Sequence, residues 1–504
     1  MTLSENQEKI IKTQGNLIVR ASAGTGKTTT MVSKIAFDIQ NNYNHKVIAA
    51  ITFTIKASRE IKNKLTIDVN RHFIGTNNSF AVEEIIKPFI KDVYGIEFAS
   101  DMSTDYSIKV ENYEKGIERI KIEKILPTYK DCKKNFIFQL ALYILKNSKA
   151  CKLYIQAKYF KLYIDEYQDC DKDMHEFFMF ICEELKIDIF VVGDEKQSIY
   201  IWRGAHPASF LSILVNPKFK KEILMDNFRS CLQIQNYSNL LCSATRSFYK
   251  KDLDLKSILL INTTQNDWNK EIIKYLDLTK KTALLCYKNK DAEEYTKLLN
   301  NINTKLKFIY IPQIPIASIT TAIAWLYNAI ANYFIIEKYS IYDFLIEVPE
   351  ESIDNNKILP YINSILKDLQ KYLENNDSKN FIIQTRLLAE YFGYETKESD
   401  IIKLYITIRK VDYHPAFEIE QHDNIATTFH SAKGLEFDQV IIFAKDYNLA
   451  DNTGIYNHYV AATRAKTKLI IIKLDEYYSE KFIKNLNSIL NESKLEINDI
   501  VTVI

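Results

Sequence analysis

The feature that most constrains the fold is a glycine-rich turn between an apolar run and a helical segment. Residues 16–20 (NLIVR) have an apolar centre and predict a β-strand, and the turn that follows, residues 21–28, reads ASAGTGKT. Glycines in such a turn let backbone N–H groups close around phosphate oxygens, and the helix from Lys27 adds the positive end of its dipole. Ala21 replaces the first glycine of the general pattern. A strand, a phosphate-binding turn and a helix in this order indicate an α/β fold with a parallel sheet.

Apolar runs of strand length alternate with helical patterns along much of the chain. A chain of 504 residues corresponds to three or four domains at about 150 residues each. The uncharged stretch 308–336 is long enough to span a bilayer. Its prolines and asparagines instead favour a strand followed by a buried helix. Further strands are predicted at residues 46–53, 161–164, 188–192, 282–286, 439–443 and 468–472.

Two regions, roughly 70–150 and roughly 340–422, lack the alternation and have mostly helical patterns. We therefore predict an α/β protein with two RecA-like parallel-sheet domains, each carrying a mostly helical insertion. The first domain would comprise residues 1–70 and 151–230, with its insertion at 71–150. The second would comprise residues 231–340 and 423–504, with its insertion at 341–422.

Composition places the chain in the cytoplasm and limits how it can bind nucleic acid. The net charge is only +2, so binding to DNA would depend on local basic patches and not on a global field. The seven cysteines are interpreted as buried thiols in a reducing cytoplasm. Residues 1–13 contain no apolar signal core, and we expect no contact with a membrane.

Two carboxylates follow the predicted strand at 161–164. In the presence of a phosphate-binding turn, Lys27 can reach the β- and γ-phosphates of ATP, and Thr28 and Asp165 can ligate Mg²⁺. Glu166 can polarise the attacking water. Each feature alone has a simpler interpretation, as a glycine turn before an ordinary helix or as a solvated acidic loop. Their co-occurrence on one chain favours ATP hydrolysis with Mg²⁺ as cofactor.

Seven segments together resemble the motifs of UvrD-like superfamily 1 helicases. Residues 165–169 (DEYQD) are similar to motif II, and residues 192–205 (VGDEKQSIYIWRGA) to motif III. The resemblance extends from Leu3 to Ala465 and implies an ATP-dependent DNA helicase or single-strand translocase that moves 3′ to 5′. The other five segments, in the order of the family, are residues 3–7 (LSENQ), 51–54 (ITFT), 227–230 (NFRS), 428–437 (TFHSAKGLEF) and 459–465 (YVAATRA).

The resemblance implies roles at the nucleotide. Gln7 would read the adenine edge, Phe228 would stack on the adenine, and Glu436 would contact the sugar. Arginine fingers, here two, stabilise the transferred phosphoryl group and accelerate hydrolysis by about 10³ to 10⁵. The predicted catalytic residues are Lys27, Asp165, Glu166, Gln197 (coupling the γ-phosphate to DNA) and the fingers Arg229 and Arg464. The predicted ATP-binding set adds Ala21, Ser22, Ala23, Gly24, Thr25, Gly26, Thr28 and Thr29.

The resemblance also implies a track for DNA. Aromatic side chains that stack on bases contribute about 1–3 kcal/mol each without sequence preference. A core position is the alternative for Tyr200 and Trp202, and a structural hydrogen bond is the alternative for His430. The predicted DNA-binding residues are Thr52, Phe53, Tyr200, Trp202, Arg203, Thr428 and His430.

The sequence departs from the family pattern at three places. Thr29 replaces an arginine that usually sandwiches the base, which puts adenine selectivity in doubt. Residues 75–80 (GTNNSF) stand where the family usually has Thr-Phe-His, and residues 455–458 (IYNH) lack the usual Glu and Arg. The insertions are also shorter than in the larger repair helicases, which puts strand separation in doubt.

Three functions are compatible with these residues. The chain could be an autonomous repair or recombination helicase, or a nucleotide-gated subunit that does not turn over. Residues 75–95 resemble the helicase subunits of Gabija anti-phage systems, which implies an OLD-family ATPase-nuclease as partner. We expect no nuclease domain after the last motif, and we expect binding to single-stranded DNA or exposed ends without sequence specificity.

Overall fold

The computed structural model describes residues 3–251, 256–302, 306–319, 321–348 and 358–504. Its contacts divide the chain into two compact units. The first unit comprises residues 1–103, 108–265 and 433–504, and the second comprises residues 104–107 and 266–432. This division is coarser than the predicted six segments, whose boundaries stay a prediction.

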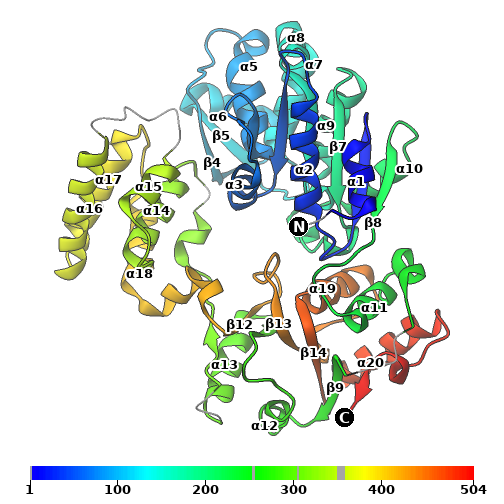
Figure 1. Cartoon of the computed structure of the whole chain (residues 1–504). Coiled ribbons are helices and arrows are strands. Elements are labelled where there is room, and N and C mark those ends of the chain that lie inside the picture. The colour runs from blue at the N-terminus through cyan, green and yellow to red at the C-terminus, as the bar shows by residue number, and fades with distance from the viewer. Residues whose placement is uncertain (1–2, 252–255, 303–305, 320, 349–357) are drawn as a thin grey trace. The chain divides into compact units, whose positions relative to one another are not determined.

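The first unit contains a six-stranded parallel sheet, part of which is visible with α1, α2 and α9 in the upper half of Figure 1. Its strand order is β3-β2-β6-β7-β1-β8. Val19 in β1 lies opposite Val192 in β7 and Glu222 in β8. The strands predicted in this sheet are confirmed, whereas the pattern misses β3 and the lysine-rich β8. The strands are β1 (Leu17–Ala21), β2 (Val47–Thr52), β3 (Phe73–Thr76), β6 (Tyr159–Ile164), β7 (Asp188–Gly193) and β8 (Lys220–Leu224).

Helices pack on this sheet through their apolar faces. Met31 and Ile35 of α2 are fully buried against Val19, Ile48 and other residues of the central strands. The N-terminal helix α1 begins with a capping box, in which Ser4 and Gln7 bond reciprocally. The helices are α1 (Glu5–Lys12), α2 (Lys27–Gln40), α3 (Ile55–Lys64), α9 (Lys172–Glu183) and α10 (Pro207–Val215).

A second parallel sheet contains seven strands. In the first unit, β13 (Phe437–Phe443), β14 (Ala465–Leu474), β9 (Ile258–Thr263) and β15 (Thr502–Val503) lie side by side in that order. Helices α11 (Leu232–Leu240), α19 (Asn452–Ala462) and α20 (Tyr477–Asn491) belong to the same unit. These strands confirm the predicted α/β class.

The second unit has parallel strands β11 (Ile309–Tyr310), β12 (Asn424–Thr428) and β10 (Thr282–Cys286). The predicted strand and buried helix in the stretch 308–336 correspond to β11 and α14. No helix in the described part of the chain is long and apolar enough to cross a membrane. The helices of the second unit are α12 (Trp268–Ile273), α13 (Asn289–Asn300), α14 (Ala324–Ile335), α15 (Ile341–Glu347), α16 (Ile358–Glu374), α17 (Ser378–Tyr391) and α18 (Glu398–Arg409).

The segment predicted as the first insertion is mostly helical but also contains a two-stranded sheet of β4 and β5. The prediction missed these strands because β4 is exposed or half-buried at most positions and β5 is interrupted by a proline, so neither forms a continuous apolar run. A π-helix at Val82–Ile86 separates α4 from α5. The elements are α4 (Asn77–Ala81), α5 (Lys87–Tyr94), β4 (Ser103–Val110), α6 (Tyr113–Glu123), β5 (Ile125–Tyr129), α7 (Phe136–Asn147) and α8 (Lys149–Lys158).

All seven cysteines are free thiols, but they are not all buried. Cys132 is exposed, and Cys231 and Cys242 are partly exposed. The prediction of buried thiols is therefore wrong for Cys132. This residue lies in the loop between β5 and α7, in which residues 130–134 are all exposed.

A buried cluster of charges joins the helix after the glycine-rich turn to the strand that precedes the acidic pair. Asp38 on α2 lies 3.2 Å from Lys34 and 3.0 Å from Lys161 of β6, and it also accepts a hydrogen bond from Tyr163. The Lys34 ammonium donates to two backbone carbonyls at the end of α1, at 3.0 and 2.7 Å. Each charge has partners, so the cluster holds α1, α2 and β6 together.

We predict that Asp38→Ala destabilises the protein by about 3–5 kcal/mol, because it leaves two buried ammonium groups uncompensated. Although burial opposes its charge, Lys161, Tyr163 and Lys34 lower the pKa of Asp38. Its contribution should therefore be present above the ordinary carboxyl pKa and be lost as the pH falls below it. Thermal unfolding at several pH values measures both effects.

The matched control is Glu8→Ala, which removes an exposed ion pair with Lys12. Such pairs contribute about 0.3–0.5 kcal/mol, so the melting temperature should barely change. Equal melting temperatures for the two variants would contradict the structural role of Asp38.

Candidate nucleotide site and DNA-binding surface

The topology of the first sheet brings the predicted catalytic segments to one edge. Strand β7 lies between β1 and β6, and all three run parallel. Their carboxyl ends therefore place the glycine-rich turn, Asp194 and the pair Asp165–Glu166 side by side. In open α/β sheets, ligands bind at this edge.

The glycine-rich turn has the backbone geometry of an anion site. Gly24 and Gly26 have φ angles of +78° and +77°, which residues with a side chain rarely adopt. A Cβ added to Gly24 would lie 2.6 Å from Asn227 Oδ1. Gly26 is the N-cap of α2, and no side chain caps this helix. The N–H groups of its first turn are thus available to phosphate oxygens.

Lys27 and Glu166 face each other across the site, with Lys27 Nζ 3.3 Å from Glu166 Oε1. Lys27 Nζ is shielded from solvent and has no hydrogen-bond acceptor among the described residues. Glu166 adopts a left-handed backbone conformation with φ of +47°, which strains a residue with a side chain and is typical of functional sites. The geometry leaves the ammonium able to accept a further anionic partner.

The two carboxylates of the acidic pair differ in protonation. Burial and the charge of Glu166 raise the pKa of Asp165. Partial burial opposes the charge of Glu166, but Lys27 and Lys433 outweigh it and lower its pKa. Glu166 is therefore the carboxylate that is already charged without a metal ion, as polarisation of a water molecule requires.

The residues present fit a magnesium nucleotide. The under-coordinated ammonium of Lys27 and the uncapped start of α2 suit phosphate oxygens, and Thr28 and Asp165 would hold Mg²⁺. Among the described residues, no group of three or more His, Cys, Asp or Glu side chains could hold a metal alone. Mg²⁺ usually binds through one or two protein ligands plus substrate phosphates and water, and there it neutralises charge that develops on the phosphates.

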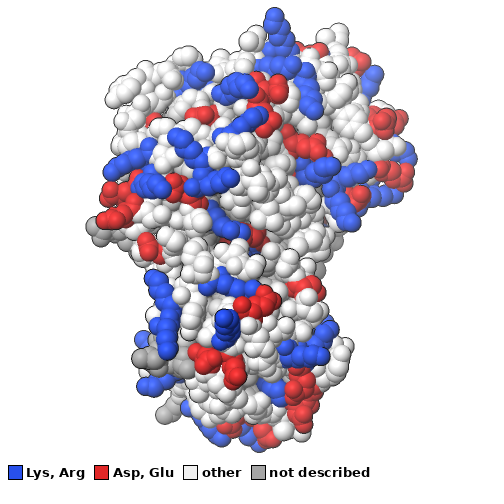
Figure 2. All heavy atoms as spheres, turned by 90° about the vertical axis from the view of Figure 1, so that its right-hand side faces the viewer, with Lys and Arg blue, Asp and Glu red and all other residues white. Residues whose placement is uncertain are grey.

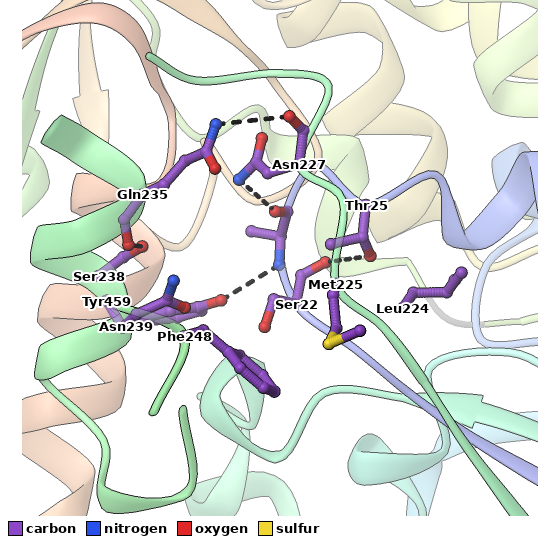
Figure 3. Close-up of a pocket in the computed structure, with 11 residues that line it drawn as sticks. Ser22, Thr25, Leu224, Met225, Asn227, Gln235, Ser238, Asn239, Phe248 and Tyr459 are labelled. Carbon is purple, nitrogen blue, oxygen red and sulfur yellow. Dashed lines mark hydrogen bonds between the residues drawn. The ribbon is translucent and has the colours of Figure 1, made fainter. Parts of the chain in front are cut away.

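A buried polar network holds the glycine-rich turn in place. The Tyr459 hydroxyl accepts a hydrogen bond from Ala23 N at 3.1 Å (Figure 3). The same hydroxyl donates to Asp194 Oδ2 at 3.2 Å. Lys196 Nζ lies 2.8 Å from Asp194 Oδ1 and donates to Ser22 Oγ at 3.0 Å. Gln197 also donates to Asp194, at 2.8 Å. Asp194 thus connects Gln197 to the phosphate-binding turn.

The segment after β8 packs directly on the turn. Asn227 Nδ2 donates to Ala23 O at 3.0 Å (Figure 3), and Phe228 N donates to Gly24 O at 2.9 Å. A Cβ added to Gly26 would lie 2.8 Å from Gln7 Nε2 and 3.9 Å from the Phe228 ring. Gln7 and the 58% exposed Phe228 therefore lie beside the same glycine, as a shared adenine site requires.

The two predicted arginine fingers have different environments. Arg229 Nε donates to Glu436 Oε1 at 2.7 Å, and Arg229 Nη1 donates to Thr463 O at 3.2 Å. Arg464 is buried and donates to the carbonyls of Val460 and Leu435, at 2.9 and 3.3 Å. The structure thus pairs Arg229 with Glu436, the predicted sugar contact. The roles of both arginines on a nucleotide stay predictions.

Lys433 is a site residue that the sequence analysis missed. Its ammonium donates to Asp169 Oδ2 at 2.6 Å and to Gln197 O at 3.1 Å, and it lies 4.8 Å from the centre of the Tyr200 ring. Lys433 therefore contacts the acidic motif, the predicted coupling residue and the predicted DNA track. Its position inside the segment TFHSAKGLEF was the signal that could have identified it, as was that of Tyr459 in YVAATRA.

The predicted DNA-binding residues of the first unit differ in their exposure to solvent. Trp202 is 60% exposed, and the Arg203 guanidinium lies 4.4 Å from the centre of its ring. A core position for Trp202 is therefore wrong, while Tyr200 and Phe53 are half-buried. Thr52 is buried and donates to Thr54 O at 3.0 Å, so its contact with DNA stays a prediction.

Thr428 and His430 belong to the second unit. Thr428 Oγ1 lies 3.1 Å from Ser431 Oγ, and the His430 ring stacks at 3.9 Å from the Phe429 ring. Their contacts with DNA stay predictions.

The departure from the family pattern at residues 75–80 has a structural explanation, because Thr76 and Ser79 form the capping box of α4 and Phe80 is buried.

The distribution of charged side chains on the surface is consistent with the prediction that DNA would bind through local basic patches. On the face in Figure 2, basic and acidic side chains alternate without a large region of one sign. A net charge of +2 over such a mixed surface leaves long-range attraction weak. Contacts with an anionic polymer would depend on particular lysines and arginines.

Two family models match the chain. The UvrD/REP helicase N-terminal domain matches residues 3–134 and 110–218, and the UvrD-like helicase C-terminal domain matches residues 424–472. The chain is 40% identical to Gabija protein GajB of Bacillus cereus (strain VD045), over 94% of this chain and 96% of that protein. It is 24% identical to ATP-dependent DNA helicase Rep of Buchnera aphidicola subsp. Acyrthosiphon pisum, over 93% and 94% of the two chains.

We predict that Lys27→Ala and Glu166→Gln both abolish DNA-stimulated ATP hydrolysis, by different routes. The lysine change should weaken nucleotide binding, because buried phosphates lose their cation. The glutamine change should leave binding nearly intact, since it removes only the carboxylate that orients water. Phosphate release and binding of a fluorescent nucleotide measure the two effects. Normal turnover by Glu166→Gln would refute the assignment.

We also predict that Arg229→Ala lowers kcat by a factor approaching the 10³ to 10⁵ that is typical of an arginine finger, with a smaller effect on KM. The matched control is Lys466→Ala, because Lys466 lies 3.3 Å from the same Glu436 but has no predicted role in catalysis. Steady-state measurement of kcat and KM distinguishes the two variants. Equal kcat values for the two variants would rule out a finger at Arg229.

Proposed function

Because this chain belongs to the UvrD/Rep-like family of DNA helicases, we propose that it is an ATP-driven motor that moves 3′ to 5′ along single-stranded DNA. The observation that carries the proposal is the meeting of Lys27, Glu166 and the segment 227–229 at one glycine-rich turn. We expect ATP and Mg²⁺ as its substrate and cofactor, and the cytoplasm, where DNA is available, as its place of action.

The chemistry requires little beyond positioning and charge. Lys27 would hold the β- and γ-phosphates, Glu166 would orient the attacking water, and Arg229 would stabilise charge on the transferred group. Mg²⁺ would supply further neutralisation of the phosphates. Arg229 is hydrogen-bonded to Glu436 at 2.7 Å. It would have to leave Glu436 before it could contact the transferred phosphoryl group.

Coupling to DNA would run through the segment 194–203. Gln197 bonds to Asp194 beside the turn, and its carbonyl accepts from Lys433, which also lies against the Tyr200 ring. A change at the phosphates could therefore alter the surface around Tyr200 and Trp202. Stacking and phosphate contacts carry no sequence information, so we expect recognition of single strands or exposed ends.

We further propose that the motor serves anti-phage defence together with a separately encoded nuclease of the OLD family. The proposal is supported by the 40% identity to Gabija protein GajB along almost the full length of both chains. An autonomous repair helicase is the alternative, and it is favoured by the full-length similarity to Rep at 24% identity. A subunit that binds nucleotide without turnover is disfavoured by Lys27, Glu166 and Arg229 in position.

We predict that co-expression with a neighbouring nuclease gene gives a stable complex and protects cells from phage only when both genes and Lys27 are intact. Lys27→Ala should abolish protection without breaking the complex, since Lys27 lies inside the nucleotide site. Size-exclusion chromatography and plaque counts measure the two outcomes. A chain that remains alone, unwinds long duplexes and rescues a repair-deficient strain would favour the autonomous helicase.

A further inference from the structure

A loop of the first insertion packs directly against the segment that carries Trp202. The thiol of Cys132 donates to Trp202 O at 3.4 Å. A Cβ added to Gly204 would lie 2.2 Å from Cys132 O and 3.7 Å from Lys133 Cα. Gly204 has a φ of +101°, so a residue with a side chain would both be strained and displace the loop. The loop, residues 131–134, and the segment Ile201–Gly204 thus meet backbone to backbone.

The loop is anchored on both sides. Lys133 N donates to Asp131 Oδ1 at 3.0 Å, which closes the turn. Asn135, the N-cap of α7, donates from Nδ2 to Asp171 Oδ2 at 2.7 Å and from its backbone N to Asp173 Oδ2 at 2.6 Å. These contacts tie the loop to the start of α9. The position of the loop beside Trp202 is therefore set by several independent bonds.

Two of the three exposed charged residues of the loop are lysines. Lys133 and Lys134 are exposed, and within the described chain neither ammonium has an ion pair or side-chain hydrogen bond. The carboxylate of Asp131 is engaged with the backbone of its own turn. Next to them, the Trp202 ring is 60% exposed and has the Arg203 guanidinium at 4.4 Å. Two lysines of the loop and Arg203 thus belong to the two segments that meet at Gly204, beside one open aromatic ring.

We propose that the loop 131–134 is part of the DNA-binding surface, with Lys133 and Lys134 holding the phosphates of a strand whose base stacks on Trp202. An aromatic ring that accepts any base, beside ammonium groups that neutralise the backbone, is the arrangement that binds single strands without sequence preference. The inference rests on the proposed function, because it takes single-stranded DNA as the ligand. An acidic protein surface could use the same lysines but would leave the ring unexplained.

The test is the salt dependence of binding to a fluorescent oligothymidine, measured by anisotropy between about 50 and 200 mM salt. Each phosphate neutralised on a single strand contributes about 0.7 to the slope of log affinity against log salt. Lys133→Ala/Lys134→Ala should therefore lower the slope by about 1.4, so that the wild-type protein loses about sevenfold more affinity over this range than the variant.

Two comparison variants make the result specific. Lys146→Ala/Lys149→Ala removes two exposed lysines from the same insertion, and its slope should equal that of the wild-type protein. Trp202→Ala should weaken binding at every salt concentration with little change in slope, because stacking releases no counterions. Thermal melting of each variant establishes that it is folded.

A third measurement needs no substitution. Cys132 is the exposed thiol of the chain, so its reaction with a maleimide should slow when oligothymidine is bound. A labelling rate that does not respond to the strand would count against the loop as a DNA contact.

An unchanged slope for the loop variant, with weakened binding by Trp202→Ala, would overturn the role of the loop and leave the proposed motor intact. Unchanged DNA affinity combined with loss of a protein partner would assign the two lysines to that partner and likewise overturn the inference. A wild-type protein that binds no single strands would overturn the proposed function together with the inference.

Discussion

The ion pair between a shielded ammonium group and one carboxylate of the acidic pair is the interaction around which the catalytic edge of this protein is organised. Lys27 Nζ lies 3.3 Å from Glu166 and has no hydrogen-bond acceptor in the described chain. Burying a charge with so few partners costs free energy, which a bound anion can recover. The uncapped start of α2 and the left-handed Glu166 add to a site that is complete only when phosphates are present.

The surrounding structure keeps this strained site in place. The cluster of Lys34, Asp38 and Lys161 connects the helix that carries Lys27 to the strand that leads into Asp165. On the other side of the turn, Asp194 receives hydrogen bonds from Gln197 and Tyr459. In rigid buried networks of this kind, a change in charge at one residue can move the neighbouring side chains, because a closely packed core has little free space in which the movement could be lost.

The arrangement also places the nucleotide site and the aromatic surface within one connected set of contacts. Lys433 bonds to Asp169 and lies over Tyr200, and Arg203 lies over Trp202. A cation that contacts a carboxylate and an aromatic ring can shift position when the charge near the carboxylate changes or when a base stacks on the ring. This continuity is the physical basis on which ATP hydrolysis and strand binding can depend on each other.

The amino-acid sequence by itself determined the α/β class and most central strands, and it identified the glycine-rich turn and the acidic pair that the fold brings to one edge of the first sheet. Strands buried on both faces are continuous apolar runs, so β1, β2, β6, β7, β10, β13 and β14 were predictable. The glycine-rich turn and the acidic pair were predictable because their chemistry depends on neighbouring residues. Strands β3, β8, β9 and β12 were not predicted. The patterns of β3 and β8 are short or interrupted by charge and are completed by pairing with the sheet. Strand β9 was missed although its first four residues form a buried apolar run, and β12 contains only two apolar residues.

Only the tertiary structure decided which distant side chains act on one another. No spacing in the sequence relates Lys433 to Asp169, Arg229 to Glu436, or Cys132 to Trp202, since 264, 207 and 70 residues separate them. Such contacts follow from the order of strands in a sheet and from the route of an insertion back to it. A local pattern reports the chemistry that a segment can perform, whereas packing sets the partner that its charge or ring meets.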